Sequence, residues 1–134
     1  MKALTIKQPF SSLVAYGAKT IEFRRSATSY RGPLLICASK DCVFDGDLEF
    51  PYGVAVAVCM VAGVEPFTED HLDRACMDTM PSETGYAWHL IGAKEIIPFP
   101  VRGIPGLFDV GETAVLIDDE DPKDHIDYWM VMSC

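Results

Sequence analysis

Three charged side chains of complementary chemistry lie close together near the start of the chain. They are Lys19, Glu22 and Arg24, within the segment 17–25, GAKTIEFRR. An ammonium and a guanidinium group can bind a phosphate or polarise a carbonyl, and a carboxylate can accept from a base amino group or act as a general base. The alternative is structural: Glu22 and Arg24 would form a same-face surface ion pair, which contributes under about 1 kcal/mol.

The flanking sequence places these residues where a helix is followed by a strand. Residues 9–16 begin with a proline, which suits the first helical position, and carry an apolar stripe on one side. Gly17 fits the left-handed position just past a helix end. Over residues 20–24, the alternation of polar and apolar side chains predicts a strand with Glu22 and Arg24 on one face.

Further short apolar runs predict a β-rich domain. Strands are expected over 3–6, 33–38, 53–61, 85–91, 95–101 and 114–117. A second short helix is expected to begin at Thr68, which can cap it, and to end before Pro81. The sequence therefore predicts an α+β fold, a small mixed or antiparallel β-barrel with two or three short helices at its ends.

The length and the apolar runs indicate one soluble domain. The chain has 134 residues, enough for one hydrophobic core and too few for two ordinary domains. No apolar run approaches the roughly 20 residues of a membrane helix. The first residues contain charge and proline where a signal peptide would be continuously apolar. We expect a cytoplasmic protein that does not enter a membrane.

Charge is distributed unevenly along the chain. The net charge of −9 argues against a general binder of nucleic-acid backbone, but residues 1–40 carry +6 and residues 41–134 carry −15. The basic side chains therefore surround the segment 17–25, which favours a local anionic ligand over a long nucleic-acid track. The acidic residues 118–127 have two interpretations. They are a solvated end, or they fold over a cleft formed by the basic residues around the segment 17–25 and mimic a nucleic-acid backbone there.

Cysteines and histidines give no sign of a metal centre in the sequence. The five cysteines are odd in number and irregularly spaced, and His71, His89 and His125 follow no metal-ligand spacing. We expect reduced thiols, no disulfide, no metal site and no cofactor.

Several short motifs share their order with one known domain family. They are LTIKQPF at 4–10, SL at 12–13, G-x-K-T-x-E-x-R at 17–24, YRGPL at 30–34, GYAWHL at 85–90 and G-x-x-G-L-F at 103–108. In these motifs the chain resembles the ASCH domain family of the PUA-like superfamily. The resemblance implies a PUA-like barrel over residues 1–110, with residues 111–134 an acidic extension packed on or trailing the same domain.

Members of that superfamily bind RNA or modified bases, so the resemblance implies an RNA- or modified-nucleotide-binding cleft beside the helix-to-strand turn. The expected ligand-binding residues are Lys7, Gln8, Lys19, Thr20, Glu22, Arg24, Arg31 and Trp88. Trp88 has two interpretations: it stacks on a base, which is worth about 1–3 kcal/mol, or it lies in the core.

Two other functions remain open from the sequence. A small bacterial branch of the family is similar to an amidohydrolase that deacetylates N4-acetylcytidine with a lysine in this turn, a threonine three residues later and a distant glutamate. Lys19 matches that lysine, Glu22 stands in place of the threonine, and no residue matches the glutamate. If the chain is an enzyme, Lys19 and Glu22 are its expected catalytic residues. The third alternative is a protein-interaction domain in which the motif is structural.

Overall fold

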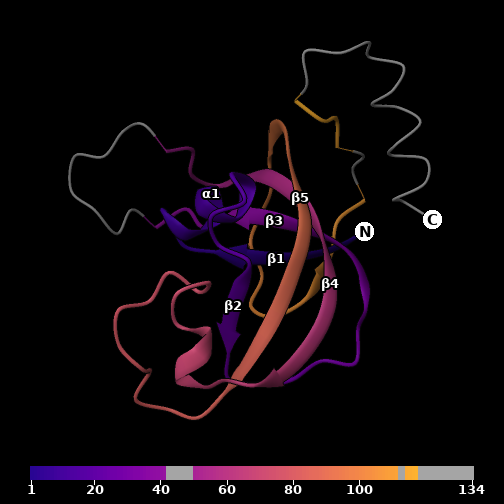
Figure 1. The fold of residues 1–134 in the computed structure, drawn as a ribbon. Coiled ribbons are helices and arrows are strands. Elements are labelled where there is room, and N and C mark those ends of the chain that lie inside the picture. Colours follow the sequence, from indigo (N-terminus) through magenta and orange to yellow (C-terminus); the bar gives the residue numbers. More distant parts are fainter. Residues whose placement is uncertain (42–49, 112–113, 118–134) are drawn as a thin grey trace.

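The computed structural model describes residues 1–41, 50–111 and 114–117 of the chain (Figure 1). In chain order the elements are β1 (Lys2–Ile6), α1 (Phe10–Ala15), β2 (Ile21–Arg24), β3 (Gly32–Ala38), β4 (Val54–Pro66), the 3-10 helix η1 (Glu69–His71), β5 (Tyr86–Pro100) and β6 (Phe108–Asp109). None of the helices in this described part is long and apolar enough to cross a membrane. The acidic residues 118–127 lie outside the described residues.

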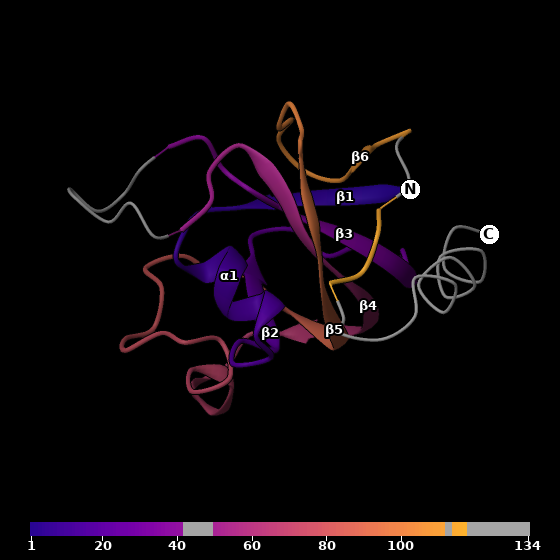
Figure 2. The same ribbon diagram turned by 90° about the horizontal axis from the view of Figure 1, so that it is seen from above.

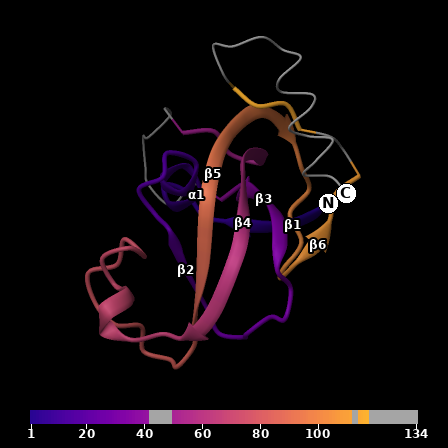
Figure 3. The same ribbon diagram turned by 45° about the vertical axis from the view of Figure 1, so that its right-hand side comes forward.

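The six strands form one mixed sheet in the order β2-β5-β4-β3-β1-β6. Neighbouring strands are antiparallel except β1 and β3, which run parallel. The long strands β4 and β5 curve side by side (Figure 3), and their pairing contains three register shifts that allow this bending. At one of these shifts Gly92 adopts a φ of 63°, which glycine tolerates without strain. The two runs predicted as separate strands over 85–101 are therefore one bent strand.

The predicted barrel is wrong in one respect, because the sheet is open. Its edges are β2 and β6, and in the described part of the chain they do not pair with each other. The edge strand β6 contains only two residues, so it offers few backbone groups for a further pairing. Residues 114–117 add an isolated bridge, Ile96 to Leu116, so the start of the predicted acidic extension contacts β5.

The second predicted helix is also wrong, since only the single turn η1 forms after Thr68. The carbonyl of Arg74 accepts hydrogen bonds from the backbone N–H groups of Thr20 and Ile21, and the carbonyl of Ala75 accepts from Lys19. These carbonyls are directed away from the helical ladder, so a regular helix cannot continue through them. In Figure 1 the whole segment 67–85 lies beside β2 at the lower left.

The main core is formed by buried residues of α1 and of β1, β3, β4 and β5, and Figure 2 shows α1 beside these strands. The helix packs on β3, β4 and β5 and contributes the buried Val14 and Ala15. Trp88 of β5 is 4% exposed in this core, and its Nε1 donates a hydrogen bond to the carbonyl of Ser26 at 3.0 Å. Of the two interpretations for Trp88, the structure therefore favours the core.

Candidate functional site

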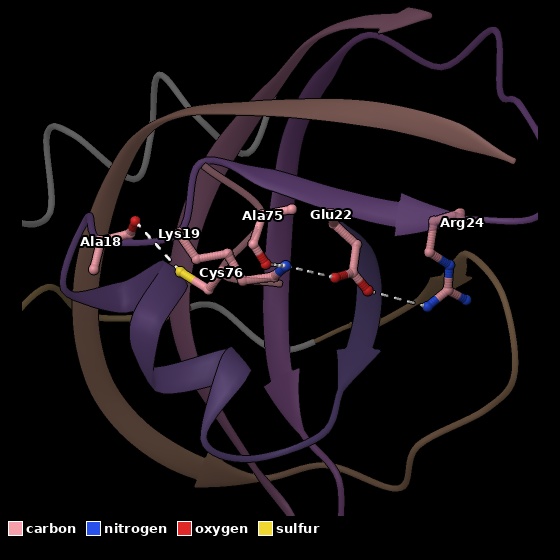
Figure 4. Close-up of polar contacts among 6 residues, drawn as sticks. All are labelled: Ala18, Lys19, Glu22, Arg24, Ala75 and Cys76. Atoms are coloured by element: carbon pink, nitrogen blue, oxygen red, sulfur yellow. Dashed lines mark hydrogen bonds and ion pairs between the residues drawn. The ribbon is translucent and has the colours of Figure 1, made fainter. Parts of the chain in front are cut away.

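Lys19, Glu22 and Arg24 form a continuous charged row (Figure 4). The Nζ of Lys19 lies 3.3 Å from Oε1 of Glu22, and Nη1 of Arg24 lies 3.5 Å from Oε2 of the same carboxylate. The exposed fraction rises along the row, from 3% for the Lys19 side chain through 12% for Glu22 to 28% for Arg24. Glu22 therefore links a buried ammonium to a guanidinium that reaches solvent.

The turn after α1 determines the position of Lys19. Gly17 has a φ of 81°, and the next two backbone N–H groups, of Ala18 and Lys19, both donate to the carbonyl of Leu13 at 3.0 Å. This closes the end of the helix and turns the chain directly into β2. The Lys19 ammonium is thereby aimed inward, 5.5 Å from the centre of the Phe10 ring.

The segment 67–85 covers the inner end of the charged row. Lys19 Nζ donates to the carbonyl of Ala75 at 2.7 Å, and Sγ of Cys76 lies 3.7 Å from the carbonyl of Ala18 (Figure 4). Cys76 itself has a φ of 58°, in the left-handed region that side chains other than glycine rarely adopt. In this conformation Lys19 helps to hold the segment 67–85 in place.

Beyond the outer end of the row lies a pocket of about 390 Å³, called the basic pocket below. Its lining residues are Thr5, Lys7, Arg24, Cys37, Ala38, Ser39, Lys40, Asp41, Val101, Gly103, Ile104, Pro105 and Gly106. Three of these side chains are cationic and one is anionic. Neither Lys7 nor Lys40 forms an ion pair within the part of the chain that the structure describes, so both are available to an anion.

Parallel pairing of β1 with β3 brings the cations of the basic pocket together. Ile6, the last residue of β1, is paired with Ala38, the last residue of β3, so the two parallel strands end side by side. Lys7 follows the end of β1 and Lys40 lies two residues after the end of β3. Both lysines therefore lie at this end of the two strands, where they line the basic pocket together with Arg24. Thr5 adds a hydroxyl that is buried and has no hydrogen-bond partner among the described residues.

The matches to known proteins agree with this architecture. Residues 4–100 match the ASCH domain. The chain belongs to the ASCH domain family. This confirms the family resemblance found in the sequence motifs, over nearly three quarters of the chain's length.

Solved structures similar to this ASCH domain include the ASCH protein of Zymomonas mobilis and two of its point mutants. The first has a TM-score of 0.63 and 13% identity, covering 95% of this chain and 93% of the other. One mutant has a TM-score of 0.60 and 12% identity, covering 95% and 94%; the second has 0.56 and 16%, covering 75% of each chain. At such low identity the likeness shows a shared fold alone. No curated protein matches the sequence.

The ligand-binding residues expected from the sequence lie in different environments. Lys7 and Arg24 line the basic pocket. Gln8 is fully buried, where its Nε2 donates to Oγ of Ser12 and to the carbonyl of Pro51, both at 2.8 Å. Gln8 therefore holds the start of α1 and does not line the basic pocket.

Thr20 and Arg31 are also bonded to their own chain. The N–H of Thr20 donates to the carbonyl of Arg74, and its carbonyl accepts from Leu90. Exposed Arg31 donates from Nη1 to two carbonyls of its own loop, those of Thr28 and Tyr30, at 2.8 Å each. Neither residue lines the basic pocket, although Arg31 keeps a solvent-exposed charge.

Lys40 and the turn 103–106 are pocket residues that the site expected from the sequence did not include. In the sequence, Lys40 was only one of the basic residues that give residues 1–40 their net positive charge. The signal that could have identified it is its place just after a strand, but its use depends on the parallel β1–β3 pairing, which the sequence did not reveal. Gly103 lies against Thr5, whose Oγ1 would be 3.0 Å from an added Cβ, so a larger residue at 103 would require the Thr5 side chain to move by a few tenths of an ångström.

Thiol reactivity provides a direct test of the burial of Cys37 and Cys59 and of the exposure of Cys76. Burial raises the pKa of Cys37, at the floor of the basic pocket, and that of Cys59 to about 12 each. At pH 8 a thiol of this pKa is ionised to roughly one part in 10⁴, and the thiolate is the reactive form. We expect iodoacetamide to alkylate half-exposed Cys76 much faster than Cys37 or Cys59, as measured by peptide mass spectrometry. Urea-unfolded protein is the control, and equal native rates at the three cysteines would contradict the arrangement.

Proposed function

We propose that this ASCH domain binds a phosphorylated nucleotide, free or as part of an RNA strand, in the basic pocket. Phosphate oxygens would be held by Lys7, Arg24 and Lys40. A guanidinium can bind two phosphate oxygens at once, and lysine acts as a point charge. A volume of about 390 Å³ lies at the lower end of the roughly 300–1,000 Å³ usual for small-molecule sites, which suits one nucleotide at a time.

The observation that carries the proposal is that Arg24 belongs both to the charged row and to the basic pocket. Glu22 orients its guanidinium from one side, and Lys19 holds the Glu22 carboxylate from the other. The family motif then has a physical purpose: its lysine and glutamate support an arginine that meets the ligand. Pre-orienting the side chain lowers the entropy lost on binding.

The apolar part of the lining is proposed to contact the nucleobase. Val101, Ile104 and Pro105 present aliphatic surface beside the cations, and none of the described lining residues is aromatic. Trp88 is left out of this site, because it is buried and its indole N–H is already bonded to Ser26.

The amidohydrolase alternative rests on the 3.3 Å contact between Lys19 and Glu22. Such a pair could work on a neutral nucleoside only if the segment 67–85 moved, since Ala75 and Phe10 now enclose the ammonium. A nucleoside pocket and a phosphate site differ in salt dependence, because phosphate contacts release counterions and nucleoside contacts do not.

Charge removal at the basic pocket tests the proposal. We expect the double variant Lys7→Gln/Lys40→Gln to weaken binding of a fluorescent single-stranded RNA about tenfold or more at low salt. The slope of log affinity against log salt should also fall by about 1 for each lysine that no longer binds a phosphate. Fluorescence anisotropy at several salt concentrations measures both quantities.

The matched control is Lys94→Gln, which removes an exposed lysine of β5 outside the basic pocket and should leave affinity unchanged. Salt-independent binding of an uncharged nucleoside that survives in the double variant would favour the hydrolase. If the protein binds neither RNA nor nucleotides, the protein-interaction alternative gains.

A further inference from the structure

A second group of polar side chains converges away from the basic pocket, from three elements. Glu65 lies at the end of β4, His71 ends η1, and His89 lies in β5. Nε2 of His71 is 3.2 Å from Oε1 of Glu65, and Nε2 of His89 is 2.7 Å from Oε2. The potential ligand atoms of all three residues lie within 4.8 Å of one another.

We propose that Glu65, His71 and His89 bind a divalent transition-metal ion, with Zn²⁺ the best fit. Two imidazole nitrogens and one carboxylate oxygen are ligands that Zn²⁺ takes at about 2.0–2.2 Å, which places neighbouring ligand atoms of a tetrahedron about 3.3 Å apart. One ligand atom from each of the three residues lies within 4.8 Å of the other two, so small side-chain movements would bring them to that spacing. Three protein ligands leave a fourth position for water.

The two histidine rings both face the Glu65 carboxylate. Their centroids are 5.8 Å apart and their planes are inclined by 77°, so both rings direct a nitrogen to the same carboxylate. His71 is buried and His89 is half-buried, while Glu65 is exposed and gives an ion access from solvent.

Thr68 supplies a partner for His71 in both the metal-free and the metal-bound form. Its backbone N–H now donates to Nδ1 of His71 at 2.9 Å, so the proton of the neutral ring lies on Nε2 and points to Glu65. A metal at Nε2 requires that proton to leave and Nδ1 to take up another. The Oγ1 of Thr68 lies 3.4 Å from Nδ1 and can accept this new N–H after a small movement. Loading at His71 thus exchanges one ring tautomer for the other.

The ion would link β4, η1 and β5 near the start of the segment 67–85. That segment carries the Ala75 carbonyl to which Lys19 donates. A ligand that binds only the folded state stabilises it by mass action, so the expected role of the ion is structural.

The test titrates the full chain, stripped with EDTA and kept reduced, with Zn²⁺ in a calorimeter and with Co²⁺ in a spectrophotometer. We expect one ion per chain, a rise in melting temperature with Zn²⁺, and a Co²⁺ spectrum without thiolate charge-transfer bands. Glu65→Gln and His89→Gln should each abolish this binding, and His125→Gln should retain it.

Thr68 offers a test that leaves the three ligands intact. Thr68→Val keeps the backbone N–H and removes the hydroxyl, so metal affinity should fall by about 10- to 100-fold. Thr68→Ser keeps the hydroxyl, and with it the cap of η1, and should retain the affinity. The proposal is overturned if no stoichiometric binding occurs, if binding is unchanged in Glu65→Gln and His89→Gln, if Thr68→Val binds as tightly as Thr68→Ser, or if Co²⁺ reports cysteine ligands.

Discussion

Replacing Lys19 with methionine is expected to lower the free energy of unfolding by about 3 kcal/mol, at the lower end of the cost of breaking a buried ion pair. The ammonium is 3% exposed and bonded to both Glu22 and the Ala75 carbonyl. Methionine keeps the length and apolar character of the lysine side chain, but the Glu22 carboxylate and the Ala75 carbonyl both lose the ammonium as their donor. Arg24 still pairs with Glu22, which is why the lower end of the range applies. Urea denaturation followed by circular dichroism measures the change.

The matched control for this variant is Lys94→Met, an exposed lysine of β5 whose loss should change stability by less than about 0.5 kcal/mol. Adding Glu22→Gln to Lys19→Met should recover part of the loss, because a nearly buried amide costs less than a carboxylate that has lost its buried partner Lys19. A loss below about 1 kcal/mol in Lys19→Met would mean that the ammonium does not hold the segment 67–85. Because the fold itself depends on Lys19, loss of function in this variant alone would not identify a catalytic lysine.

Replacing Gly85 with alanine is expected to be the second most damaging change, since no room exists for a Cβ at the start of β5. The added atom would contact the ring of Phe23 and lie 2.6 Å from the carbonyl oxygen of Arg24. A backbone oxygen cannot rotate away, so β2 would have to move from β5, with which Arg24 pairs at Tyr86. Overpacking of this kind costs about 1–3 kcal/mol.

The same movement would displace the Arg24 guanidinium, so Gly85→Ala should also weaken nucleotide binding in the folded protein. Thermal unfolding and anisotropy with labelled RNA measure the two effects. Gly111→Ala is the control, because nothing lies within 4 Å of its added Cβ. Unchanged stability together with unchanged binding in Gly85→Ala would show that β2 is not held against β5 as described.

Local sequence determined the elements that present the charged row. The alternation in residues 20–24 and the glycine at position 17 predicted the helix-to-strand turn, which the structure contains as α1 and β2. Because side chains of a strand alternate with period two, Glu22 and Arg24 had to share a face, and they are in contact. The motifs also identified the family, which the match over residues 4–100 confirms.

Tertiary structure alone decided which charges line the basic pocket. Ala75, 56 residues away in the chain, covers Lys19, and the parallel pairing of β1 with β3 brings Lys7 beside Lys40. Period and capping signals act over one or two turns, whereas these contacts join elements that are distant in sequence.

The same reason explains why no sequence pattern indicated the Glu65–His71–His89 group or the open sheet. The three members of the group come from three elements with no shared spacing, and only the pairing of β4 with β5 and the hydrogen bonds that hold the segment 67–85 bring them together. Whether a sheet closes depends on how its last strands meet, and among the described residues β6 and β2 do not pair. A side chain's chemistry and its face on a strand are local properties, but its neighbours in space are set by the whole fold.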